Sequence, residues 1–235
     1  MGTLPSIAPA APLQLPAPFH ARSLRQVHRT GNYHFRFARQ PVGGAVKRTF
    51  DVVLSGAALL ALALPMLVIA LLVCADSSGP ALFRQRRTGF RGRAFTVLKF
   101  RSMRCDDHAV VQATRQDNRV TKLGHFLRRT SLDELPQLIN VFKGDMSLVG
   151  PRPHAITHDA SFWRVDQAYP VRFLARPGIT GEAQVAGHRG ETDTPEKVEA
   201  RLRCDLAYVR NWSLLGDIAI IRRTVRVLFG DANAY

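Results

Sequence analysis

Residues 127–140 read LRRTSLDELPQLIN, a stretch that brings two arginines close to two adjacent carboxylates, Asp133 and Glu134. Ser131 and Glu134 have the spacing of a capping box, and the proline that follows is tolerated only near the start of a helix. Apolar residues then recur at helical spacing as far as Gly144, which favours the end of the helix. The pattern predicts a short helix whose N-terminal end lies at the two acids.

An acid pair at the start of a helix has two interpretations. The helix dipole and the free N–H groups of the first turn favour negative charge, so Asp133 and Glu134 can act simply as caps. The same setting keeps a carboxylate ionised and lets a phosphate dock beside it. The rest of the chain has to decide between a cap and a chemical site.

The composition indicates anionic partners. The 235 residues include 33 Lys and Arg against 18 Asp and Glu, a formal net charge of +15. Such an excess is typical of proteins that meet nucleic acid, an anionic membrane or phosphorylated substrates. Cys74, Cys105 and Cys204 are far apart and lack zinc-ligand spacing, so we expect reduced thiols in a cytoplasmic setting. No glycine-rich fingerprint of the Rossmann or P-loop kind is present.

The first third of the chain predicts a tail followed by a membrane segment. Residues 1–45 are rich in Ala and Pro and then in Arg, which predicts a disordered basic tail. Residues 52–75 are apolar almost throughout, and as a helix they would reach about 36 Å, enough to cross a hydrocarbon core of about 30 Å. Basic residues flank both ends, which favours the cytoplasmic side for both. With Pro65 near the middle, we predict a re-entrant helix–break–helix over residues 46–77; a buried core helix is the alternative.

A β-hairpin is predicted over residues 81–103, with its turn at Gly89 and Gly92. Period-two alternation places Lys99 and Arg101 on one face of the second strand. A diphosphate can bind to that face. A charge stripe that faces solvent or lipid headgroups explains the pattern equally well.

Three later positions are further candidates for substrate binding. Arg152 stands between two prolines that stiffen its backbone, and a pre-set guanidinium suits bidentate phosphate binding. Arg176 begins a second stiff turn. Glu191 lies in the glycine-punctuated segment 187–194, which can hydrogen-bond a sugar or a nucleotide. Each of these segments is also explained as a rigid or exposed loop.

Two helices are predicted near the C-terminus. Pro195 begins a pattern of apolar residues at helical spacing. That pattern comprises Val198, Leu202, Leu206 and Val209. Residues 217–229 place apolar residues opposite three arginines, which is typical of a basic amphipathic helix in a membrane interface. An ordinary surface helix is the alternative.

Six blocks in this order resemble the bacterial sugar transferase family, the monotopic polyprenyl-phosphate hexose-1-phosphate transferases. The blocks are KRTFD at 47–51, FRQRRTG at 83–89, KFRSM at 99–103, 127–137, 144–153 and RPGITG at 176–181. The resemblance extends from about Lys47 to Tyr235. PRPHA at 151–155, GETDT at 190–194 and RNWS at 210–213 are most similar to the undecaprenyl-phosphate glucose phosphotransferases.

The resemblance implies an activity. It is the transfer of a hexose 1-phosphate, with glucose 1-phosphate in first place, from a UDP-sugar to undecaprenyl phosphate, with release of UMP and with Mg²⁺ as the cofactor. It implies Asp133 as the nucleophile of a covalent aspartyl-phosphosugar and Glu134 as the second catalytic carboxylate and the metal ligand. Arg128 and Arg152 fall at matching positions and would steady phosphate oxygens. Galactose and an N-acetylhexosamine remain alternative sugars, and the product would feed exopolysaccharide or capsule.

The expected fold is α+β and mainly helical. It comprises a re-entrant membrane helix–break–helix, a small β-hairpin and amphipathic interfacial helices around a cytoplasmic active site, with residues 78–235 as the sugar-phosphate transferase domain. We expect the bacterial inner membrane, with this domain on the cytoplasmic face. The expected partners are membrane lipid and, through the C-terminal helix, a second copy of the chain, but not nucleic acid.

Two non-enzymatic hypotheses remain. A basic, membrane-attached nucleic-acid binder would use the positive charge, but the sequence has no aromatic stacking cluster or known DNA-binding motif. A membrane scaffold would leave the acid pair and the Pro-Arg-Pro turn without a purpose.

Overall fold

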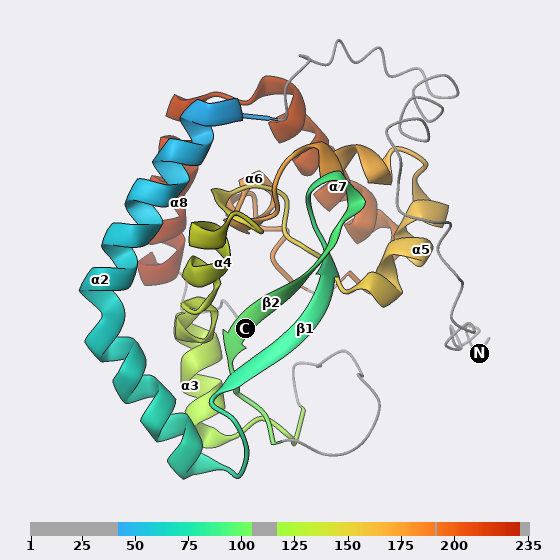
Figure 1. The fold of residues 1–235 in the computed structure, drawn as a ribbon. Coiled ribbons are helices and arrows are strands. Elements are labelled where there is room, and N and C mark those ends of the chain that lie inside the picture. Colours follow the sequence, from blue (N-terminus) through green and yellow to red (C-terminus); the bar gives the residue numbers. More distant parts are fainter. Residues whose placement is uncertain (1–41, 105–116, 191, 231–235) are drawn as a thin grey trace, which may run out of the picture.

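The computed structural model describes residues 42–104, 117–190 and 192–230. This part of the chain is mostly helical, with two small sheets. Figure 1 shows the long helix α2 (Gly44–Asp76) along one side of the molecule, with the shorter helices and a β-hairpin on its inner side. Most of the predicted tail, residues 1–41, lies outside the described residues.

The remaining elements are helices, short strands and 3₁₀ turns. The helices are α3 (Lys122–Thr130), α4 (Gln137–Lys143), α5 (Ile156–Val165), α6 (Glu182–Val185), α7 (Pro195–Asn211) and α8 (Leu214–Gly230). The strands are β1 (Leu82–Thr88), β2 (Ala94–Phe100), β3 (Ser147–Val149) and β4 (Gly178–Thr180). The 3₁₀ turns are η1 (Phe90–Gly92), η2 (Leu132–Glu134) and η3 (Tyr169–Leu174).

The predicted hairpin is confirmed. Strands β1 and β2 pair antiparallel, with Leu82 opposite Phe100 and Thr88 opposite Ala94. Its connection contains Gly92 in the left-handed region, which a glycine adopts without steric cost. The hairpin carries Lys99 into the interior of the molecule, toward α4 and η2.

Helix α2 is apolar and exposed. Its 33 residues correspond to about 50 Å, and it is long and apolar enough to cross a membrane. Only 6% of its most apolar 18-residue window is buried. A core helix of a soluble protein would be mostly covered, so the alternative of a buried core helix is wrong.

The predicted break at Pro65 is wrong in one respect. Helix α2 continues through Pro65 without ending. A proline inside a helix removes one backbone hydrogen bond and forces a bend, and flanking turns can hold the helix together. Figure 1 shows the helix bending near its middle. That both ends lie on one side of a bilayer stays a prediction.

The N-terminal turns of α2 are anchored in the protein by buried polar side chains. The Lys47 Nζ lies 2.5 Å from the Asp217 Oδ2 on α8. One turn later, the Asp51 Oδ1 accepts hydrogen bonds from the Ser147 hydroxyl and the Leu148 N–H of β3, both at 3.0 Å. Thus α2 is fixed to the C-terminal helix and to the second sheet.

The segment 176–181, which the sequence predicted as a stiff turn, instead contributes β4 to a parallel pair with β3. Ser147 on β3 is opposite Gly178 on β4, and Val149 is opposite Thr180. The chains approach so closely that a Cβ atom on Gly178 would lie 2.1 Å from the Gly150 nitrogen. The pair fixes the start of the Pro151–Pro153 turn.

The predicted inner face of α7 is confirmed, since Val198, Leu202, Leu206 and Val209 are all buried. The first three pack against Phe162 of α5 and Tyr169 of η3, whereas Val209 packs against Val149 of β3 and Ile220 of α8. Pro195 is the first residue of α7, and the Thr194 hydroxyl caps it.

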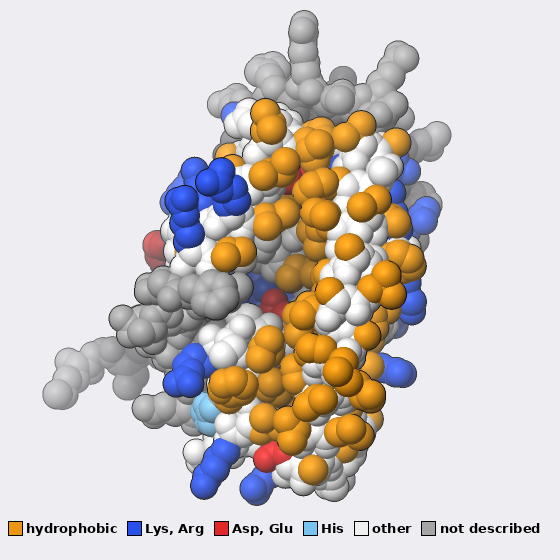
Figure 2. Space-filling model, turned by 90° about the vertical axis from the view of Figure 1, so that its left-hand side faces the viewer, with side chains coloured by type: hydrophobic (Ala, Val, Ile, Leu, Met, Phe, Trp, Pro, Cys, Tyr) orange, Lys and Arg blue, Asp and Glu red, His pale blue; other side chains and the backbone are white. Residues whose placement is uncertain are grey.

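One face of the molecule exposes many large apolar side chains. They include Leu60, Leu64, Leu67 and Leu71 of α2, Phe142 of α4, and Leu215, Ile218 and Val225 of α8. Figure 2, viewed from the α2 side, shows hydrophobic side chains gathered on this face around a central hollow with acidic and basic side chains inside it. A contiguous apolar surface of this kind marks a membrane or partner contact.

Candidate active site

The stretch that organises the sequence folds as two helices joined by a 3₁₀ turn. Helix α3 ends at Thr130, η2 carries Asp133 and Glu134, and α4 follows. The predicted capping box is wrong, because Ser131 has a left-handed backbone with φ 58° and makes no cap. Gly144, with φ 96°, ends α4 as predicted.

Helix α4 is held against the hairpin by Asn140. Its side-chain oxygen accepts the Leu98 N–H at 3.0 Å, and its side-chain nitrogen donates to the Thr96 carbonyl at 2.8 Å. Asn140 therefore serves as a strand partner for β2. This contact fixes the two acids opposite Lys99, although the sequence pattern gave it no role.

Glu134 is buried and bound by two cations from different elements. Its Oε1 lies 2.8 Å from the Lys99 Nζ of β2 and 2.6 Å from the Arg152 Nη2 of the Pro-Arg-Pro turn. Its Oε2 accepts a longer bond, 3.3 Å, from the Arg152 Nη1. Asp133 is equally buried, but its nearest ion-pair partner among the described residues is Lys99, at 3.8 Å.

The two acids are therefore electrostatically different. Burial raises the pKa of Asp133, and Glu134 adds to this, while Lys99, Arg152 and Arg128 oppose it. Burial would also raise the pKa of Glu134, but Arg152 and Lys99 together outweigh burial and hold that pKa well below its usual range. Glu134 is thus held as an anion, whereas the charged form of Asp133 is less favoured.

A buried polar network holds Arg152 in place. The Arg172 Nη2 donates to the Arg152 carbonyl at 2.5 Å, and Arg172 also pairs with Asp205 at 2.8 Å. The His154 Nδ1 lies 2.6 Å from the Arg172 Nη1. Burial, together with Arg172 and Arg201, holds the pKa of His154 well below its usual range, so this histidine is neutral and accepts the bond.

Five of the sequence-predicted residues come together and two do not. Asp133, Glu134, Lys99, Arg152 and Arg128 form the cluster.

Two predicted phosphate ligands lie elsewhere. Arg101 is buried and donates to the Val73 and Ser77 carbonyls at the end of α2. Arg176 donates to the Gly144 carbonyl at the end of α4. Both bind helix C-termini, where a positive charge is favourable. The structure thus gives no support to Arg101 and Arg176 as phosphate ligands, and Glu191 lies outside the described residues.

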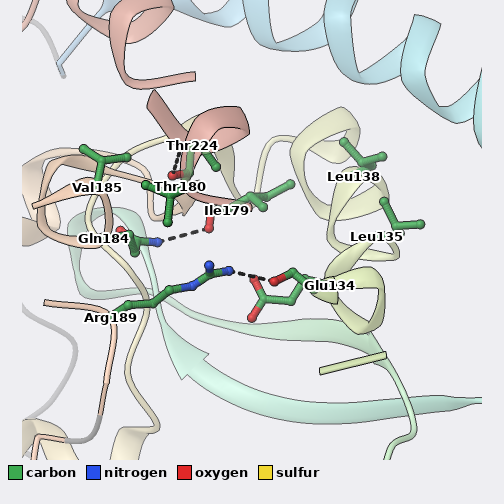
Figure 3. A pocket seen from close by; sticks show the side chains of 11 residues that line it. Glu134, Leu135, Leu138, Ile179, Thr180, Gln184, Val185, Arg189 and Thr224 are labelled. Carbon is green, nitrogen blue, oxygen red and sulfur yellow. Dashed lines mark hydrogen bonds between the residues drawn. The ribbon is translucent and has the colours of Figure 1, made fainter. Parts of the chain in front are cut away.

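A cavity of about 170 Å³ adjoins the cluster, lined in part by Glu134. Figure 3 shows Arg189 pointing across it toward Glu134, with apolar side chains on the opposite wall. The Arg189 Nη2 donates to the Ser131 hydroxyl at 2.8 Å. Sequence reasoning did not select Arg189, although it lies in the polar segment 187–194. Its position between Gly187 and Gly190 was the sequence feature that could have indicated a role in binding.

The donor set fits magnesium in kind. Mg²⁺ is commonly held by one or two carboxylates together with phosphate oxygens and water, and Asp133 and Glu134 are adjacent in the chain. Glu134 already contacts two cations, so Asp133 is the less committed donor. Within residues 42–104, 117–190 and 192–230, no three His, Cys, Asp or Glu side chains converge.

The chain resembles known proteins over most of its length. Residues 42–231 match the family model described as bacterial sugar transferase. The UDP-glucose:undecaprenyl-phosphate glucose-1-phosphate transferase of Escherichia coli (strain K12) is 50% identical over 196 residues, which cover 83% of this chain but 42% of the relative. The protein of the same name from Caulobacter vibrioides is 50% identical over 192 residues, covering 80% and 72%. An exopolysaccharide production protein of Rhizobium leguminosarum bv. phaseoli is 49% identical over 186 residues, covering 77% and 93%. The chain thus spans less than half the length of the E. coli relative.

Proposed function

This chain belongs to the bacterial sugar transferase family, and we propose that it transfers a hexose 1-phosphate from a UDP-sugar to undecaprenyl phosphate with release of UMP. The names of the E. coli and Caulobacter relatives favour glucose as the sugar. The observation that carries the proposal is the buried Asp133–Glu134 pair, held by Lys99 and Arg152 next to an exposed apolar face.

The chemistry proceeds in two displacements. An Asp133 carboxylate oxygen attacks the phosphorus that bears the sugar, and the bond between that phosphorus and the UMP oxygen breaks. UMP leaves with the electron pair, and the phosphosugar is bound to Asp133 as a mixed anhydride. A phosphate oxygen of undecaprenyl phosphate then attacks the same phosphorus and releases the Asp133 carboxylate. A carboxylate is a weak nucleophile, and a covalent intermediate divides one difficult transfer into two easier ones.

The remaining side chains of the cluster neutralise charge. Lys99 and Arg152 lie where they can shift from Glu134 toward phosphate oxygens that approach Asp133. Arg128 lowers the pKa of Asp133, which favours its ionised form. Magnesium bound through Glu134 or Asp133 would neutralise the diphosphate charge during the transfer. Because the reaction exchanges one phosphoanhydride for another, the main task of the protein is to position the reacting groups.

The proposed acceptor is a membrane lipid, so the chain should act at a membrane surface. The exposed apolar face would seat the chain on the cytoplasmic surface of the inner membrane, where α2 enters the lipid and undecaprenyl phosphate presents its headgroup. We place the reaction at the first membrane step of exopolysaccharide or capsule synthesis, in line with the name of the Rhizobium relative.

The test is UMP release by the purified chain in nanodiscs, with a panel of UDP-sugars and undecaprenyl phosphate. We expect UDP-glucose to be the best donor and the release to require magnesium. A second arm omits the acceptor and seeks a phosphosugar adduct on Asp133 by mass spectrometry. Absence of UMP release with every donor would refute the activity, and release without any adduct would refute the covalent route.

A further inference from the structure

We infer that the cavity beside Glu134 is the subsite for the first isoprene unit of the lipid acceptor, and that Arg189 at its rim binds the acceptor's phosphate. This inference rests on the proposed function and assigns one substrate to a defined part of the site.

The cavity has an apolar wall and a polar end, as an amphiphile requires. The wall is formed by Leu135, Leu138, Ile179, Val185 and Val227. The polar end is formed by Glu134, Ser131 and Arg189. Its volume is about 170 Å³. An apolar cavity of roughly 150 Å³ is large enough for benzene, so a five-carbon isoprene unit fits.

The wall suits a hydrocarbon better than a sugar or a base, because it is mostly apolar and most of its polar groups are already paired. The Thr180 and Thr224 hydroxyls bond to each other at 2.7 Å. The Gln184 Nε2 donates to the Ile179 carbonyl at 3.1 Å, whereas the Gln184 Oε1 is buried without a hydrogen-bond partner among the described residues. A sugar or uracil placed here would meet one unpaired acceptor, the Gln184 Oε1, and would lose most of its hydrogen bonds to water without replacing them, which is unfavourable.

The cavity is also bordered by helices that contribute to the apolar face. Its wall includes α4 and α8, and the same two helices expose Phe142, Leu215 and Val225. Figure 2 shows that this face is hollowed near its centre, with hydrophobic side chains around the hollow. A prenyl chain can therefore pass from lipid into the cavity along apolar surface.

The rim supplies a cation beside the turn that carries Asp133. Among the described residues, Arg189 pairs with the neutral Ser131 hydroxyl rather than with a carboxylate, at 2.8 Å. Ser131 is two residues before Asp133, and it stands at the start of the same 3₁₀ turn. A phosphate held by Arg189 would thus lie close to Asp133 with its hydrocarbon chain directed into the cavity.

The test fills the cavity from two sides. Val227→Trp on α8 and Val185→Phe on α6 place bulk in the wall. Ala219→Trp is the control, since Ala219 is exposed on the same helix as Val227 and does not line the cavity. Each variant is measured in nanodiscs for phosphosugar adduct formation without acceptor, and for kcat/KM toward undecaprenyl phosphate. Thermal unfolding reports whether each variant is folded.

We expect both cavity variants to lower kcat/KM for undecaprenyl phosphate by about tenfold or more, the scale of losing burial of two or so methylene groups. Adduct formation from the UDP-sugar should be unchanged, and Ala219→Trp should behave as wild type in both assays. Two folded variants with normal kcat/KM would overturn the subsite while leaving the activity intact. Loss of adduct formation as well would assign the cavity to the sugar donor and also overturn it. If the wild-type chain releases no UMP, the proposed function itself fails.

Discussion

Lys47 and Asp217 are 170 positions apart in the sequence, yet the Lys47 Nζ lies 2.5 Å from the Asp217 Oδ2 with both side chains buried. The Tyr208 hydroxyl and the Trp212 Nε1–H also donate to Asp217, at 2.8 and 3.1 Å. This joint connects the start of α2 to α8, two helices that expose apolar side chains on one face. It therefore sets how the apolar face and the acid cluster are oriented to each other.

Breaking this joint should lower the stability of the fold without directly affecting the reaction at Asp133. Asp217→Asn leaves the Lys47 ammonium buried without its counter-ion, which costs about 3–5 kcal/mol for buried pairs. We expect a lower midpoint of thermal unfolding in nanodiscs. Asp193→Asn is the control, because its ion pair with Lys197 is exposed and such pairs contribute about 1 kcal/mol or less. Equal effects of the two substitutions would contradict the joint.

Asp133→Asn should abolish adduct formation and transfer without loss of stability. Burial raises the pKa of Asp133, which means that the fold disfavours its charged form. The neutral amide removes that charge, so the unfolding midpoint should stay the same or rise. Parallel assays of UMP release and thermal unfolding check both halves. A variant that is both inactive and clearly destabilised would indicate that Asp133 is a structural residue.

Glu134→Gln should lower the stability of the folded chain, unlike Asp133→Asn. The pKa of Glu134 is held well below its usual range, so its charge stabilises the folded state at pH above its unfolded pKa of about 4.3. The substitution leaves Lys99 and Arg152 without their shared anion and should cost about 3 kcal/mol at neutral pH.

The difference in the free energy of unfolding between the wild-type chain and Glu134→Gln should depend on pH. It should be full at neutral pH and shrink as the pH falls below about 4 toward the folded pKa, because Glu134 then becomes protonated in the unfolded and finally in the folded chain. Chemical unfolding of both chains between neutral and acidic pH measures it. Glu199→Gln on the exposed side of α7 is the control, and a pH-independent difference would exclude the ionic cause.

Substitutions of Arg101 and Lys99 should have different effects, because Arg101 binds the end of α2 whereas Lys99 lies at the acid pair. Arg101→Gln should lower the unfolding midpoint, because it removes the donor to the Val73 and Ser77 carbonyls, and leave KM for the UDP-sugar unchanged. Lys99→Gln should raise KM or lower kcat by about tenfold or more, since Lys99 lies at both acids. A higher KM for a folded Arg101→Gln chain would restore its predicted role at the phosphate.

The sequence by itself determined the features that depend on neighbours along the chain. The two glycines of the hairpin turn, the apolar face of α7 and the end of α4 at Gly144 were all predicted, because periodicity and backbone sterics act over a few residues. The blocks around Asp133 and Arg152 likewise indicated the family that the family model confirms.

Tertiary structure decided which partner each charge has. The sequence grouped Arg101 and Arg176 with Arg152, but only Arg152 binds an acid of the cluster, while the other two bind helix ends. It assigned Lys47 to a basic flank, whereas the folded chain gives it Asp217. The physical reason is that an ion pair depends on the spatial approach of two side chains, which in this protein is set by contacts between segments far apart in the chain.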